Sequence, residues 1–291
     1  MDRVVNRQTS WYVINIKARS NQTPQHYVDA WNLINEQDPL IELPKTSNRF
    51  ASIRTMSFSQ QFDNNNIPHY IETKLVAYTI IDPEKFYNRR TKEDMEIDWN
   101  TDVVANKKES VLIFIPSVHT LAVKKNTEIT INYILTYLQG ALNTIEPEGF
   151  DVDLIKDRET LDQILCAHAL ISIDAHISFS NPGHTDGFQA IFETKMRDAN
   201  PCSFDIKING SKEHPLSCQE DGLIKSIINL SESNGNVKAV VQRGENSGLE
   251  VIDTDEHPFI LKLSQIINNI CSTIYNELRA RYSNNNSNGQ E

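Results

Sequence analysis

The stretch His168–Ser180, HALISIDAHISFS, decides the fold. Its odd positions from 169 to 179 are all apolar, whereas its even positions are mostly polar and include Asp174 and His176. This alternation with a period of two is typical of a strand that buries one face. The sequence therefore predicts a half-buried strand here, and the neighbouring patterns show what surrounds it.

Strand patterns dominate before residue 125, and helices alternate with strands after it. Predicted strands span residues 11–19, 49–60, 70–81, 111–115 and 118–124, with one helix from 24 to 35. Later helices are expected at 131–142, 161–165, 187–197, 223–228 and 261–282, between strands at 151–156, 204–208 and 237–241. Residues 89–108 form an exposed acidic connection, and Gly235 has the place of a glycine cap ending a helix.

These patterns predict an α+β protein with two subdomains. A strand-rich N-terminal half, residues 1–125, packs with an α/β C-terminal half, residues 126–282, that ends in a long helix. Residues 283–291 are rich in Asn and Ser and are predicted to be a disordered tail.

Composition favours a soluble cytosolic protein. Hydrophobic residues make up 39% and charged residues 23% of the 291 residues, as in ordinary globular proteins. The apolar runs are too short for a membrane span, and no secretory signal is readable. The four cysteines lack CxxC spacing, which argues against a disulfide framework or a structural zinc site.

Charge is distributed unevenly along the chain. The net charge is −11, which opposes binding to a polyanion, yet residues 1–60 hold seven basic and five acidic side chains. Aromatic residues Trp11, Phe50 and Phe58 lie close to these cations in the sequence. The segment predicts either a nucleic-acid-binding patch or an ordinary solvated rim around a core. The candidate binding residues are Lys17, Arg19, Arg49 and Arg54.

Two weaker patterns suggest catalysis. Asp174 and His176 project from the same face of their strand, about 7 Å apart, where they can bind a metal or share a proton, or simply form a polar surface. Glu72 and Lys74 match the E-x-K half of a metal-dependent nuclease site, or form a cross-strand salt-bridge pair. Nucleotide cradles, zinc-protease helices and nucleophile elbows are missing from the sequence, so no cofactor is expected.

Several segments resemble a bacterial family of unknown function, DUF4747. They are Phe114–Leu121, Ile177–Asn181, Asp221–Ile224, Asn234–Ala239 and Thr254–Pro258, and the resemblance covers residues 10–262. In layout the chain also distantly resembles the phage exclusion protein RexA. Together these resemblances imply a cytosolic protein of a phage-defence or abortive-infection locus, and RexA-like proteins are thought to dimerise and bind DNA without strong sequence preference.

The resulting expectation is an antiphage-defence component that binds or senses DNA or RNA as a homo-oligomer. One alternative is a metal-dependent nuclease or toxin that uses Asp174, His176 and Glu72. Another is an interaction partner of a neighbouring effector protein. The last helix either contributes to a dimer interface or packs on its own domain.

Overall fold

The computed structural model describes residues 8–44, 48–98, 100, 102–125, 128–178, 201, 203–220, 222–245, 247–264 and 269–287. The predicted helix at 187–197, Phe179 and Ser180 lie outside these residues. The last helix, α6 (Ile270–Ser287), extends into the predicted disordered tail, so residues 283–287 are helical, and residues 288–291 lie outside the described part of the chain.

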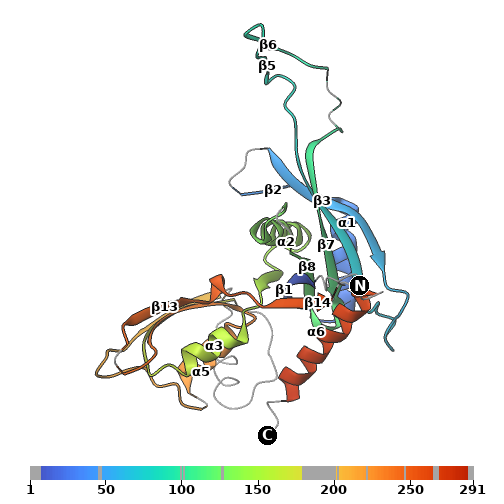
Figure 1. The fold of residues 1–291 in the computed structure, drawn as a ribbon. Coiled ribbons are helices and arrows are strands. Elements are labelled where there is room, and N and C mark those ends of the chain that lie inside the picture. The colour runs from blue at the N-terminus through green and yellow to red at the C-terminus, as the bar shows by residue number, and fades with distance from the viewer. Residues whose placement is uncertain are drawn as a thin grey trace, which may run out of the picture.

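The larger of the two main sheets is built mainly from the first half of the chain (Figure 1). Its strand order is β14-β1-β8-β7-β4-β3-β2, and β9 also pairs with β1. All of these pairs are antiparallel. The strands are β1 (Gln8–Ala18), β2 (Ile41–Glu42), β3 (Arg49–Phe58), β4 (Ile71–Thr79), β7 (Ala105–Ile115), β8 (Thr120–Lys124), β9 (Phe150–Leu154) and β14 (Ile260–Ser264).

Helices cover both faces of this sheet to different extents. On one face, α1 (Pro24–Gln37) and α2 (Ile131–Ile145) bury a core that includes Tyr27, Trp31 and Leu138. The indole N–H of Trp31 donates a hydrogen bond of 3.0 Å to Thr73 Oγ1, which satisfies a buried donor. On the other face, α6 (Ile270–Ser287) packs over Trp11 and Val13.

The smaller sheet has the antiparallel order β11-β10-β12-β13. Its strands are β10 (Ala169–Ser178), β11 (Ser203–Asn209), β12 (Gly235–Gln242) and β13 (Leu249–Asp253). Helices α3 (Arg158–Leu165) and α5 (Leu223–Leu230) contribute to the core on one face, against Ile173, Ala175 and Ile177. Asp174 and His176 are exposed on the other face, so the predicted alternation is confirmed from Ile173 to Ile177. It is wrong at the start of β10, because a bulge between Leu170 and Ser172 places Leu170 in the core in place of Ile171.

The expected exposed connection at 89–108 contains regular structure. Strands β5 (Phe86–Asn88) and β6 (Glu93–Met95) form a two-stranded hairpin that projects far from both sheets (Figure 1). Strand β7 then begins at Ala105, inside the segment expected to be irregular.

The start of the last helix was predicted wrongly. Residues 260–264 form β14, which pairs with β1, and α6 begins only at Ile270. The apolar residues of this stretch fit a helical spacing, but Leu261 and Leu263 also alternate as in a strand. Pairing with β1 decides between these patterns, because tertiary contacts override local periodicity. The prediction that a long helix ends the fold is confirmed.

Gly235 does not cap a helix, contrary to the sequence prediction. Helix α5 ends at Leu230, and Gly235 is the first residue of β12 with a φ of 137°. A Cβ placed on it would lie 2.0 Å from the His176 carbonyl oxygen. Glycine is therefore required by backbone conformation and by close strand approach.

The fold is α+β, as predicted. The two sheets divide the chain in a different place from residue 125, because α2, β9 and β14 all pack with or pair into the large sheet. Among the described residues, no helix has the length and apolarity required to cross a membrane.

Candidate nucleic-acid interface

The four cations predicted from the N-terminal segment lie in separate places. Strand β1 carries Lys17 near its end, and three strands separate β1 from β3, which carries Arg49 and Arg54. Lys17 donates a hydrogen bond to Asn234 Oδ1. Arg19 makes a two-pronged contact with Asp151, at 2.7 and 3.1 Å, and its side chain is only 25% exposed. These two cations therefore bind groups of their own chain.

Arg49 and Arg54 are on the same strand but face different surroundings. The Arg49 guanidinium lies 5.3 Å from the ring centre of Tyr133 in α2, on the side of the sheet that α1 and α2 cover. Arg54 is exposed at a bulge of β3 and forms an ion pair with Glu109 on β7. Of the four, Arg54 is the one that lies on an exposed cationic surface.

That surface is the part of the large sheet beside α6, and we call it the basic face. Alternation defines it: Leu75 and Val123 point into the α1–α2 core, so Lys74 and Lys124 point to the opposite side. Lys107 has the same parity as Val111 and Ile113, which lie against α6. The basic face comprises Arg54, Lys74, Lys107 and Lys124, all exposed.

The basic face carries more positive than negative charge. Glu109 lies among its cations, in ion pairs with Arg54 and, at 3.1 Å, with Lys107. Lys74 is opposite Val111, and the pairing of Leu112 with Val123 places Lys124 on the far side of Val111. Two strand spacings thus separate Lys74 from Lys124, about 10 Å. Cations at such spacing on a strand surface suit the phosphates of a nucleic acid.

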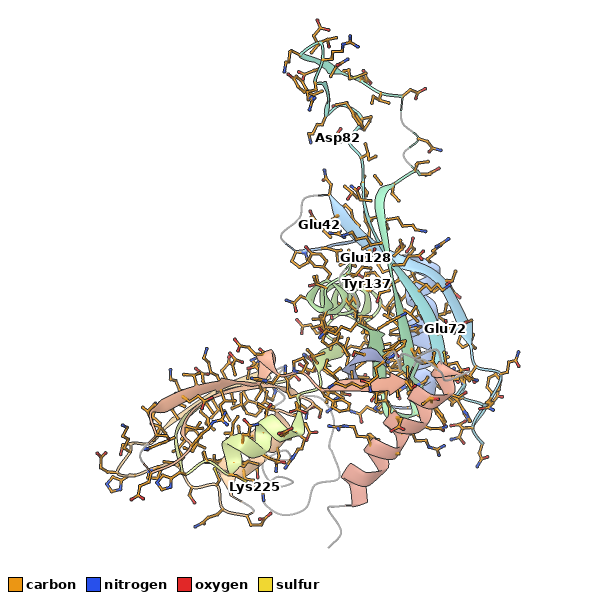
Figure 2. All side chains as sticks on the ribbon, viewed as in Figure 1. Glu42, Glu72, Asp82, Glu128, Tyr137 and Lys225 are labelled. Carbon is orange, nitrogen blue, oxygen red and sulfur yellow. The ribbon has the colours of Figure 1, made fainter. Side chains whose placement is uncertain are left out.

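Glu72, the other member of the E-x-K pattern, faces α6. Figure 2 labels it on β4 of the large sheet. The Cys271 thiol lies 3.6 Å from its Oε2. Burial, helped by the charge of Glu72, raises the pKa of the Cys271 thiol to about 12, so the thiol stays protonated. Among the described residues, no group of three His, Cys, Asp or Glu side chains is placed to hold a metal ion.

The open face of the small sheet is a network of opposite charges. His176 Nδ1 lies 2.7 Å from Asp205 Oδ1, and Asp174 lies 3.8 Å from Lys207 Nζ on the same neighbouring strand. On the other side of β10, Lys238 of β12 is the cross-strand neighbour of Asp174. The structure thus gives Asp174 and His176 cross-strand partners, as in a solvated strand surface. Lys225 on α5 marks the helix side of this sheet in Figure 2.

Buried polar groups join the two sheets. We call this cluster the polar seam. The Ser178 hydroxyl donates to Asp153 Oδ2 at 2.5 Å, and the Asn15 side chain donates to the Ser233 carbonyl at 2.9 Å. Burial raises the pKa of Asp153, with Ser178 opposing the shift. The seam comprises Asn15, Lys17, Asp153, Ser178 and Asn234.

His119 lies beside this region and stays neutral. It stacks on Tyr27 at 4.2 Å between ring centres. Burial, together with the charge of Lys17, lowers the pKa of His119 to about 4. The group cannot act as a cation toward phosphate near neutral pH.

Sequence reasoning found Arg54 and Lys74 but assigned them to different sites, and it missed Lys107 and Lys124. Lys74 and Lys124 each lie next to buried residues of their strands, and that pattern was the available signal, whereas neither neighbour of Lys107 in β7 is buried. The pairing of β3, β4, β7 and β8 was needed to bring the four side chains to one face.

The family model described as "Domain of unknown function (DUF4747)" matches residues 7–279. A search of curated proteins finds no match for the chain.

Proposed function

The chain belongs to the DUF4747 family, and we propose that it is a cytosolic component of a bacterial antiphage defence system that binds DNA or RNA as a homo-oligomer. The defence role rests on the distant resemblance of its layout to the phage exclusion protein RexA. The binding role rests on the basic face.

One observation carries the binding proposal. In a protein of net charge −11, four exposed cations lie on one sheet face, where Glu109 pairs with two of them and Glu72 lies farther along β4 against α6. A local field of this kind attracts phosphates although the whole molecule repels them. Its cations come from strands and not from a helix that could enter a groove of the duplex. This arrangement favours contacts to the phosphate backbone of the nucleic acid over contacts to base edges.

A salt titration tests whether such binding exists. Fluorescence anisotropy with labelled duplex DNA, single-stranded DNA and RNA measures the affinity at several salt concentrations. Four phosphate contacts give a slope of log K against log salt of about −3.6 for duplex DNA. Absence of binding at low salt, or an affinity independent of salt, contradicts the proposal.

The defence role has its own test. A host carrying the chain with its native neighbouring genes should restrict phage plaques, and exchange of the basic-face lysines for Glu should weaken the restriction. Undiminished restriction by a variant that no longer binds nucleic acid would separate defence from nucleic-acid binding.

A further inference from the structure

Strand β13 lies at one edge of the small sheet, as the last strand in its order. It pairs with β12 on one side, and no described residue pairs with its other side. An edge strand presents a row of unpaired backbone N–H and C=O groups, which can template pairing with another strand.

The sequence of β13 leaves this edge open to pairing. Leu249-Glu250-Val251-Ile252-Asp253 contains neither Lys nor Pro, and its pairing with β12 has no register shift. Leu249 is 49% and Val251 56% exposed. The opposite edge of the same sheet differs, because β11 carries an outward lysine, Lys207. Lysines, prolines and bulges are the usual protection of edges.

The charges of β13 are compensated within its own chain. Arg243 contacts both carboxylate oxygens of Glu250, at 2.6 and 3.0 Å. Lys238 lies 3.5 Å from Asp253. The edge therefore meets a copy of itself without net repulsion between unpaired carboxylates.

We propose that β13 pairs antiparallel with β13 of a second copy of the chain, about a two-fold axis at Val251. This register uses all five residues: Leu249 faces Asp253 of the second copy, Glu250 faces Ile252, and Val251 faces Val251. It is self-complementary, as a two-fold interface requires. The two small sheets join into one continuous sheet, and Val240 and Val251 of both copies lie together on its open face.

The proposal gives an interface to the homo-oligomer part of the proposed function, on which it rests. A strand of five residues buries little area, so the dimer forms with a Kd on the order of micromolar.

The first test compares two exposed aliphatic residues. Sedimentation across a range of concentrations should show a concentration-dependent dimer for the unmodified chain and a monomer for Val251→Lys. Leu40→Lys is the matched control, because Leu40 is 58% exposed and lies outside both sheets. A monomeric unmodified chain, or equal dimerisation of Val251→Lys and Leu40→Lys, overturns the proposal.

The second test locates the axis. Under mild oxidation in a Cys166→Ser background, Val251→Cys should cross-link two copies, because residues facing each other across strands have Cβ atoms about 5 Å apart. Leu249→Cys should not, since four residues offset it from its own counterpart by about 13 Å. Equal cross-linking of the two variants overturns the register.

The outcome is distinguishable from failure of nucleic-acid binding. The affinity of Val251→Lys for single-stranded DNA, measured at low salt, reports on the basic face of each copy. Retained affinity with loss of the dimer supports both proposals, whereas retained affinity with an unchanged dimer overturns only the β13 pairing.

Discussion

The Ser178 hydroxyl donates a hydrogen bond of 2.5 Å to the Asp153 carboxylate, and this contact connects β10 of the small sheet with β9 of the large one. Lys17 and Asn234 form a second contact between a strand of the large sheet and the turn before β12. Polar contacts of this kind fix the two sheets relative to each other through geometry, because buried polar groups must find partners.

Asp153→Asn tests the seam. Burial raises the pKa of Asp153 in the folded protein, so the folded state takes up the proton at a higher pH than the unfolded chain. At pH 7 the folded protein bears the cost of a buried carboxylate, and Asn removes that cost while its carbonyl still accepts from Ser178. We expect the variant to be at least as stable as the unmodified chain at pH 7.

This advantage should shrink as the pH falls through the raised pKa, since protonation then stabilises the unmodified protein. Urea unfolding at pH 7 and pH 4 measures the difference. If the unmodified chain is instead more stable than Asp153→Asn at pH 7, and this difference disappears at pH 4, then ionised Asp153 stabilises the fold.

His119→Asn tests a titration of opposite sign. The folded pKa of His119 is about 4, below the ordinary 6.5, so the unfolded chain takes up the proton first as the pH falls. The stability that neutral His119 contributes is complete above pH 6.5, and about 3 kcal/mol is lost on the way to pH 4. Asn tolerates the left-handed φ of 54° and does not titrate. The free energy of unfolding of the variant should therefore fall less steeply between pH 6.5 and pH 4 than that of the unmodified chain. An identical pH dependence in both proteins contradicts the assignment.

Gly235→Ala should destabilise the fold by about 3 kcal/mol, because a Cβ meets the His176 carbonyl and the φ is positive. Gly244→Ala is the matched control, since a Cβ there has no neighbour within 4 Å. Thermal unfolding of both variants measures the effect. Similar midpoints for the two would show that β10 and β12 are not held as closely as the structure has them.

Asp174→Ala and His176→Ala distinguish binding from metal-dependent cleavage. Both side chains have partners on β11 and are exposed, so we expect each variant to keep its fold and its nucleic-acid affinity within twofold. A nuclease assay with Mg²⁺ and Mn²⁺ provides the measurement. Metal-dependent cleavage by the unmodified protein that both variants lose would favour the nuclease alternative.

Local patterns predicted most elements but not their partners. The helical spacing in α2 was sufficient because it buries one continuous face, and the alternation in β10 was sufficient from Ile173 to Ile177, beyond the bulge. The helix predicted over residues 260–264 was wrong, since their pattern suits both a helix and a strand. Only the pairing with β1 decides between the two. The basic face depends on register between strands far apart in sequence, which no single stretch encodes. The ion pair between Arg19 and Asp151 could not be predicted from the sequence either.

The central claim is that nucleic acid binds at the basic face, and paired charge reversals test it most directly. Lys74→Glu with Lys124→Glu alters this face, whereas Lys207→Glu with Lys238→Glu makes the same charge change on the open face of the small sheet. We predict that the first pair weakens binding to single-stranded DNA at least about tenfold more than the second, because direct phosphate contacts outweigh long-range repulsion. Equal losses of affinity for the two pairs would contradict the account.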